Sequence, residues 1–258
     1  MEPRLEESTL KTLRGNLASL RLEVGRAAER AGRPQGVVAV VAVTKYVGPR
    51  VVRGLHALGL RDFGESTPQR LETMVEALAD LTDARWHLVG HLQRNKVRRV
   101  LRHSRCVHSL DSERLLEEIA AQASRRGLPV PDLYVEINAG GEAQKTGLPP
   151  GRVRDLLRAA RRLEASSGLA APAGVAGRLP IIGLMAVAPL SENPEDSRPC
   201  FRRLRELRDE LVGEGFLDAG AGLSMGMSGD FQVAVEEGAT AIRVGSILFR
   251  GLQGLAEG

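Results

Sequence analysis

Aromatic residues and cysteines are both scarce in this chain of 258 residues. Phe, Tyr and Trp together make up 3% of the sequence, so the core must be built largely from Val, Leu, Ile and Ala. That composition favours α/β packing over an aromatic-rich β-sandwich. The two cysteines, Cys106 and Cys200, fit neither a disulfide framework nor a cysteine metal site, and we expect no metal.

The chain also lacks an apolar segment of membrane-spanning length, and its charged first residues contain no apolar signal region. We therefore expect a cytoplasmic protein without membrane contacts. Its 36 basic and 32 acidic residues give a net charge of +4. The arginine clusters lie on amphipathic helical patterns mixed with Glu and Asp, and no nucleic-acid-binding motif accompanies them. They indicate solvated helix faces, so nucleic acid is not an expected partner.

Short apolar segments alternate with helical patterns along the chain. The predicted strands lie near residues 37–45, 61–65, 85–90, 106–110, 132–138, 180–187, 222–225 and 241–248. The predicted helices lie near residues 49–59, 68–80, 95–102, 112–126, 151–164, 195–213 and 229–237, after an amphipathic helix that ends at about residue 31.

This alternation predicts one α/β domain over residues 1–258, a TIM-type (β/α)8 barrel with an additional N-terminal helix. An open doubly wound sheet is the alternative, but such a sheet would usually have fewer strands. The Gly/Pro-rich segment at about 165–178 interrupts the rhythm and predicts a flexible surface insertion.

Lys45 ends the apolar run of the first predicted strand. Binding and catalytic groups of such barrels gather where strands end, and alternation places Lys45 on the same side as Val41 and Val43. Burial there would favour the neutral, nucleophilic amine that Schiff-base chemistry needs. The alternative is a lysine that caps the strand and reaches solvent.

The segment from Ser224 to Asp230 closes the seventh strand and opens a helix. Gly226 would let the backbone approach a ligand closely, and Ser228 could bind that ligand or serve as a helix N-cap. Gly245 and Ser246 follow the eighth strand. Because barrels often bind phosphate at the loops after strands seven and eight, these residues predict a site for a phosphate monoester.

Arg243 shares the alternation of Ala241 and Gly245, which places it inside the barrel. A buried arginine needs an anion or another acceptor, and pairing with Glu136 or Glu65 is the purely structural alternative. A phosphate site and an inward-facing lysine together suggest pyridoxal 5′-phosphate (PLP). Arg243 could then face the pyridine nitrogen and leave it unprotonated, which would weaken the cofactor as an electron sink.

Several segments, in order, resemble the pyridoxal phosphate homeostasis protein family, which shares its barrel with the N-terminal domain of alanine racemases. They are Ala-Val-Thr-Lys at 42–45, Phe-Gly-Glu at 63–65, Trp-His-Leu-Val-Gly-His-Leu-Gln-Arg-Asn-Lys at 86–96, Gly-Leu-Met at 183–185, Leu-Ser-Met-Gly-Met-Ser at 223–228 and Arg-Val-Gly-Ser at 243–246. The likeness covers almost the whole chain, and the ordered series makes it highly specific.

The resemblance implies that Lys45 carries PLP as a Schiff base and that Arg243 lies near the pyridine nitrogen. It also implies phosphate contacts from Ser224, Gly245 and Ser246. The full predicted cofactor-binding set adds Ser66, His87, Asn138, Met185, Met225, Gly226 and Ser228. Ser66 departs from the family, which usually has asparagine there, whereas Ser246 keeps the hydroxyl of the usual threonine. The family buffers or delivers PLP, with no firmly assigned turnover reaction.

An amino-acid racemase of the alanine racemase type is the rival function. It needs a second acid/base, and the chain has only Tyr46 and Tyr134 as tyrosines. Tyr46 has the opposite alternation to Lys45, and Tyr134 lies early in its strand, so neither is expected to complete the pair. A phosphate-sugar aldolase fits the ordered segments less well. We therefore expect a monomeric, non-catalytic PLP carrier or regulator that contacts PLP-dependent apoenzymes transiently, with weak racemase or transaminase side activity still open.

Overall fold

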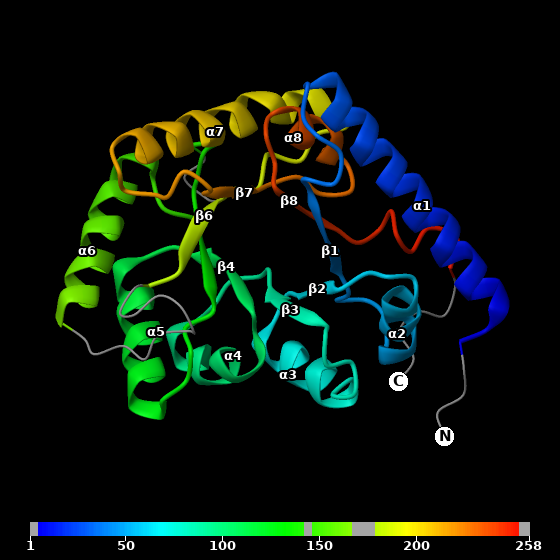
Figure 1. Ribbon diagram of the computed structural model, residues 1–258, viewed down its shortest axis with the longest axis horizontal. Coiled ribbons are helices and arrows are strands. Elements are labelled where there is room, and N and C mark those ends of the chain that lie inside the picture. The colour runs from blue at the N-terminus through cyan, green and yellow to red at the C-terminus, as the bar shows by residue number, and fades with distance from the viewer. Residues whose placement is uncertain (1–4, 142–145, 167–178, 253–258) are drawn as a thin grey trace.

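The computed structural model describes residues 5–141, 146–166 and 179–252. Within them, eight parallel strands close into a barrel in the order of the sequence, and β1 pairs with β8 (Figure 1). The strands are β1 Ala39–Val43, β2 Asp62–Glu65, β3 Arg85–Leu88, β4 Cys106–Leu110, β5 Asp132–Glu136, β6 Ile181–Met185, β7 Gly222–Ser224 and β8 Ala241–Val244. The predicted (β/α)8 barrel is confirmed.

Helices cover the outside of this barrel and connect successive strands (Figure 1). They are α1 Glu7–Arg30, α2 Pro49–Ala57, α3 Pro68–Ala77, α4 Val97–His103, α5 Glu113–Arg126, α6 Val153–Ser166, α7 Arg198–Gly213 and α8 Phe231–Glu236, with short 3-10 turns at Arg94–Lys96, Pro150–Arg152 and Pro194–Ser197. Most of the insertion predicted at 165–178 lies outside the described residues. None of the described helices is long and apolar enough to cross a membrane.

The N-terminal helix α1 covers the seam between β8 and β1. It packs against α8 on one side and α2 on the other (Figure 1). It thus occupies the position that a helix after β8 would take in a regular barrel. Leu13, Leu17 and Leu20 form its buried stripe. Asn16 donates hydrogen bonds from Nδ2 to the carbonyls of Leu248 and Arg250, both at 2.9 Å, and so ties the segment after β8 to α1.

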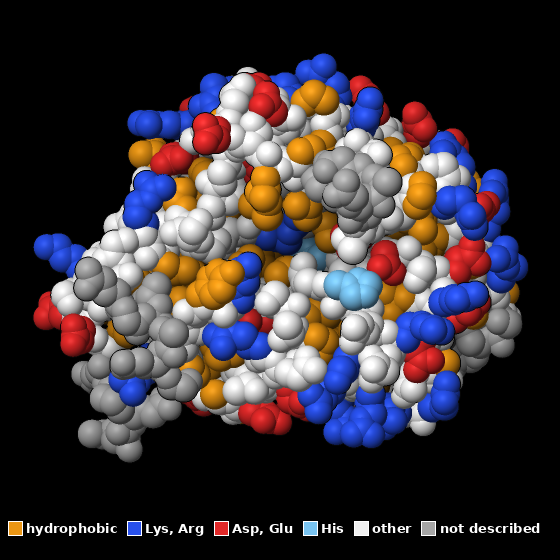
Figure 2. All heavy atoms as spheres, turned by 180° about the vertical axis from the view of Figure 1, so that it is seen from behind, with side chains coloured by type: hydrophobic (Ala, Val, Ile, Leu, Met, Phe, Trp, Pro, Cys, Tyr) orange, Lys and Arg blue, Asp and Glu red, His pale blue; other side chains and the backbone are white. Residues whose placement is uncertain are grey.

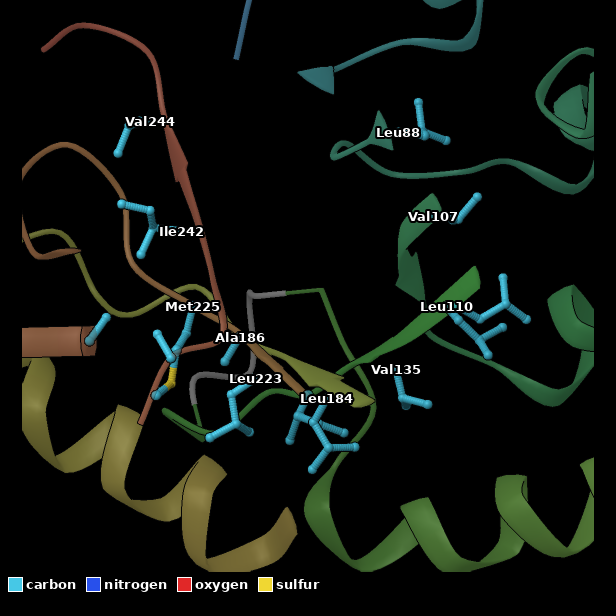
Figure 3. Close-up of a cluster of buried hydrophobic side chains, with 14 of the residues drawn as sticks. Leu88, Val107, Leu110, Val135, Leu184, Ala186, Leu223, Met225, Ile242 and Val244 are labelled. Carbon is cyan, nitrogen blue, oxygen red and sulfur yellow. The ribbon is translucent and has the colours of Figure 1, made fainter. Parts of the chain in front are cut away.

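The strands are apolar on the outside, whereas many of their inward side chains are polar. Figure 3 shows outward side chains from β3 to β8, including Leu88, Val107, Val135, Leu184, Leu223 and Ile242, in the hydrophobic cluster beneath the helices. The alternate positions hold buried polar groups, namely Asp62, His87, His108, Glu136, Ser224 and Arg243. A barrel whose core were purely structural would be filled by branched apolar residues, so this polar interior indicates a function.

Six strands end earlier than the sequence predicts, the third, fifth and seventh by one or two residues. The first ends at Val43 rather than at 45, the sixth at Met185 and the eighth at Val244. At the end of β1, the Thr44 amide donates the last hydrogen bond to β2, at the Gly64 carbonyl. The Val47 amide then donates to the Thr44 carbonyl in the turn that follows. Apolar composition continues into these turns, so it could not mark where the strands stop.

The cap of α5 offers a test of how local sequence sets a helix boundary. The Ser112 hydroxyl accepts a hydrogen bond from the Leu115 amide at 3.4 Å, which satisfies one of the free N–H groups of the first turn. We expect Ser112→Ala to lower the free energy of unfolding by about 1 kcal/mol, measured by urea denaturation. Ser124→Ala, at an exposed position of the same helix, should change it by less than about 0.5 kcal/mol. Equal effects of the two substitutions would mean that the cap contributes nothing.

Candidate functional site

Lys45 lies just past the end of β1, at the mouth formed by the carboxyl ends of the strands. Its side chain is exposed, and its Nζ lies 4.7 Å from the centroid of the Tyr46 ring. The expectation of a buried amine is therefore wrong, and so is the argument that alternation separates Tyr46 from Lys45. Alternation holds only within a strand, and both residues belong to the turn that follows β1.

The loops after β7 and β8 meet at the Ser228 hydroxyl. Its Oγ accepts hydrogen bonds from the amides of Gly245 at 3.2 Å and Ile247 at 3.4 Å. Ser228 is not a helix N-cap, because α8 begins three residues later and Asp230 stands at its start. The two N–H groups thus fix the Ser228 oxygen, and the Ser228 O–H remains as a donor that a phosphate monoester can accept.

Glycines allow this convergence. Gly226 has φ 95°, and a Cβ there would lie 2.6 Å from the Cβ of Ala234. A Cβ at Gly245 would lie 3.1 Å from the carbonyl oxygen of Val43, so the loop after β8 packs against the end of β1. The predicted phosphate loops and the strand that leads to Lys45 are therefore neighbours.

Arg243 lies inside the barrel, as its alternation predicts, with 5% of its surface exposed. It pairs with Val41 in the sheet register and donates hydrogen bonds to Ser224 Oγ at 2.5 Å and to the Ala186 carbonyl at 3.0 Å. Among the described residues no carboxylate forms an ion pair with it. Glu136 instead accepts a hydrogen bond from Thr146, and Glu65 pairs with Arg70. Burial lowers the pKa of Arg243 to about 10, which leaves it charged at neutral pH.

Ser224 is the last residue of β7 and is hydrogen-bonded to Arg243 inside the barrel, so it does not belong to the loops of the predicted phosphate site. It is fully buried, and its hydroxyl bonds to both His108 Nδ1, at 2.7 Å, and Arg243. His87 lies on the other side of His108, with its Nδ1 at 3.0 Å from His108 Nε2. Sequence reasoning placed Ser224 at a phosphate and overlooked His108, although its position in β4 indicates an inward side chain.

The other predicted residues take different places. Met185 packs inside the barrel with Cys106 and Tyr134, whereas the Met225 side chain belongs to the outer hydrophobic cluster (Figure 3). Asn138 follows β5 and accepts a hydrogen bond from the Gly141 amide at 3.0 Å. Ser66 and Ser246 lie in the turns after β2 and β8. Figure 2 shows a face on which hydrophobic side chains surround a central hollow where basic and histidine side chains are visible.

Tyr134 stacks on His108, with ring centroids 4.9 Å apart, well inside the barrel. Burial, followed by the nearby Cys106, raises the pKa of its phenol from 10 to about 12. Because the folded pKa lies above the unfolded one, the stability linked to this group is complete below pH 10 and is lost as the pH rises through 12.

An alkaline titration followed by phenolate absorbance tests this assignment. We expect an ionisation step near pH 12 that is absent from Tyr134→Phe and retained in Tyr46→Phe. Tyr46 is the matched control because 70% of its surface is exposed. Ionisation of Tyr134 at the ordinary value of 10 would contradict its burial against His108.

The sequence matches the family described as alanine racemase, N-terminal domain, over residues 15–253. A pyridoxal phosphate homeostasis protein of Aquifex aeolicus is 41% identical over 226 residues, which cover 88% of this chain and 92% of the relative. The chain belongs to the pyridoxal phosphate homeostasis protein family. The resemblance seen in the sequence is confirmed.

Other members of the pyridoxal phosphate homeostasis protein family show the same extent of similarity. The protein of that name from Pseudomonas aeruginosa is 35% identical, covering 93% of this chain and 96% of the relative. The crystal structure of PipY from Synechococcus elongatus with PLP bound superposes with a TM-score of 0.72 at 32% identity, covering 92% of this chain and 99% of PipY. These relatives match the chain over their whole length, so the family barrel accounts for nearly all of it.

Proposed function

We propose that this chain is a cytoplasmic, monomeric protein of PLP homeostasis, which holds PLP on Lys45 and releases it to PLP-dependent apoenzymes. Residues 1–258 would form one domain. The relatives named pyridoxal phosphate homeostasis protein and the PLP-bound PipY support the choice of cofactor. The observation that carries the proposal is Arg243, a buried cation without a carboxylate contact among the described residues, between the end of β1 and the loop of Ser228.

The residues present fit PLP in charge and in hydrogen-bonding capacity. When bound, PLP supplies an aldehyde that condenses with a primary amine, with loss of water, to a Schiff base. Lys45 provides the exposed amine at the mouth. The hydroxyls of Ser228 and Ser246 would donate to the phosphate, with Ser228 held in place by the amides of Gly245 and Ile247. Arg243 would donate to the ring nitrogen.

The chemistry of Arg243 explains why the site would hold PLP rather than use it. A guanidinium only donates hydrogen bonds, so a ring nitrogen facing it must stay unprotonated. An unprotonated ring is a weak electron sink, and carbanions formed next to it would be poorly stabilised. Retention of the cofactor needs only the amine and the phosphate contacts.

The racemase alternative depends on a second acid/base. Tyr134 is buried against His108 inside the barrel and cannot reach a substrate at the mouth. Tyr46 lies directly beside Lys45, and the amine contacts the face of its ring. This arrangement does not provide the two opposed bases of efficient racemisation, although Tyr46 is the group to test for any weak activity.

Transfer of PLP and racemase turnover, measured on the same preparation, separate the two functions. We expect one PLP per chain, restoration of activity to a PLP-dependent apoenzyme, and formation of D-alanine from L-alanine at the background rate of free PLP. Pyridoxal, which lacks the phosphate, should bind at least about tenfold more weakly, equivalent to about 1.4 kcal/mol. Robust racemase turnover would overturn the carrier function, and failure to bind PLP would overturn the whole proposal.

A further inference from the structure

A continuous series of side-chain hydrogen bonds runs through the interior of the barrel. Arg243 bonds to Ser224 at 2.5 Å, and Ser224 bonds to His108 Nδ1 at 2.7 Å. His108 Nε2 bonds to His87 Nδ1 at 3.0 Å, and His87 Nε2 bonds to Asp62 Oδ1 at 2.9 Å. All five side chains are buried. The proposed carrier function involves only the first of them directly.

With both imidazoles neutral, the two ends of the series fix the direction of every hydrogen bond in it. Arg243 can only donate, and an ionised Asp62 can only accept. Ser224, having accepted from Arg243, donates its one proton to His108 Nδ1. His108 must then donate from Nε2 to His87, and His87 from Nε2 to Asp62. Each ring then carries its proton on Nε2 and has a bare Nδ1, whereas a doubly protonated His87 would make His108 donate from Nδ1 to Ser224.

The charges around the series agree with this assignment. Burial raises the pKa of Asp62, but the hydrogen bonds from His87 and Arg85 outweigh it and hold the pKa below the ordinary value. Burial, with the nearby charge of Arg243, holds the pKa of His108 well below its usual range, which keeps this ring neutral. The remaining titratable neighbours of His108 and Arg243 are Cys106, Tyr134, Glu136 and Asp230.

Asp62, the last residue of the series, lies at the end of the barrel opposite to the candidate site. It is the first residue of β2 and is held by Arg85 through hydrogen bonds of 2.8 and 2.5 Å. Both residues line a cavity of about 390 Å³, together with Gly36, Val38, Val40 and Arg61. These residues lie at or just before the amino ends of the first three strands, so the series joins that end to Arg243.

We propose that Asp62, His87, His108 and Ser224 form a one-directional hydrogen-bond relay that positions Arg243 as a donor toward the ring nitrogen of PLP. The inference rests on the proposed function for its ligand, but the relay itself belongs to the protein without PLP. The Asp62 carboxylate at the far end of the relay offsets the positive charge of the Arg243 guanidinium through the polarised hydrogen bonds between them. It does not contact Arg243 directly, so it leaves the remaining N–H donors of Arg243 available to PLP. These four are positioning residues.

A metal ion is the rival explanation for part of this cluster. Ligand atoms of His87, Cys106 and His108 lie within 4.8 Å of one another. The two imidazole nitrogens that face each other are already joined by a hydrogen bond, however, and burial raises the pKa of Cys106 well above its usual value, which favours the thiol over the thiolate ligand. The relay explains the positions of both imidazole rings and keeps the hydrogen bond between them.

Nitrogen-15 NMR of the histidine rings in the protein without PLP tests the relay independently of the carrier function. At neutral pH we expect His87 and His108 both to carry a proton on Nε2 and none on Nδ1. A proton on Nδ1 of either ring, or doubly protonated rings, would overturn the proposal. So would stoichiometric Zn²⁺ binding that removes both Nε2–H signals.

Ser224→Ala then tests the link to the cofactor. With ¹⁵N-labelled PLP bound, the ring-nitrogen shift should match an unprotonated, hydrogen-bonded pyridine in the natural protein and should move in Ser224→Ala. Ser109→Ala is the matched control, since Ser109 is buried beside His108 in β4 and its hydroxyl has no hydrogen-bond partner within the described residues. A shift unchanged by Ser224→Ala, or changed equally by Ser109→Ala, would contradict the relay. Absence of bound PLP would instead refute the carrier function and leave the histidine result standing.

Discussion

Lys45→Ala is expected to abolish covalent PLP binding. Schiff-base formation needs a primary amine within reach of the aldehyde, and Lys45 supplies it at the end of β1, next to the loops that would hold the phosphate. The measurement is the absorption band that appears when purified protein is mixed with PLP. We expect this band in the natural protein and none above that of free PLP in the variant.

Lys11→Ala is the matched control for Lys45→Ala. Lys11 is an exposed lysine of α1, so its removal changes the net charge equally without touching the mouth of the barrel. Its absorption band should equal that of the natural protein. If Lys45→Ala kept the band while Lys11→Ala lost it, the assignment of the lysine would be wrong. Phosphate contacts should still let Lys45→Ala bind PLP weakly and reversibly, which equilibrium dialysis would detect.

Gly90→Ala is expected to destabilise the fold by about 3 kcal/mol or more. A Cβ at this position would lie 2.1 Å from the carbonyl oxygen of Ser66 and 2.9 Å from its carbonyl carbon. These are backbone atoms of the turn after β2, so no side chain can rotate to relieve the overlap, and the turn itself would have to move. Urea denaturation monitored by circular dichroism measures the loss.

Gly15→Ala provides the comparison for Gly90→Ala. Gly15 lies inside α1, and a Cβ there meets nothing within 4 Å. Alanine is the better helix former, so this substitution should stabilise the protein by about 0.5–1 kcal/mol. The two substitutions add the same methyl group and should shift the urea midpoint in opposite directions. A Gly90→Ala variant as stable as the natural protein would contradict the close approach of the two turns.

The alternation of apolar strand segments with helical patterns was sufficient to predict the barrel, and alternation of residues within the eighth strand predicted that Arg243 faces inward. Arg243 is inside because Ile242 and Val244 face the helices, and this could be seen in the sequence. The surroundings of Lys45 and Tyr46 could not be predicted, because alternation has no meaning beyond the last ladder hydrogen bond of β1.

The contacts across the barrel were also beyond the sequence. Ser224 and Ser228 both flank Gly226 and look equivalent in the motif, but one turns inward to His108 and the other outward to the amides of Gly245 and Ile247. Which residues meet depends on the stagger of eight strands around the axis, and no local pattern encodes it. His108 could have been found in the sequence, because alternation within β4 indicates an inward side chain there.

Reduction of the PLP-loaded protein with borohydride, followed by peptide mass spectrometry, tests the central claim most directly. Borohydride adds hydride to the carbon–nitrogen double bond of a Schiff base and converts it into a stable secondary amine, so the lysine that held PLP stays marked. The expected result is one phosphopyridoxyl group per chain, on the peptide that contains Lys45. A label on another lysine, or no label after saturation with PLP, would contradict the account.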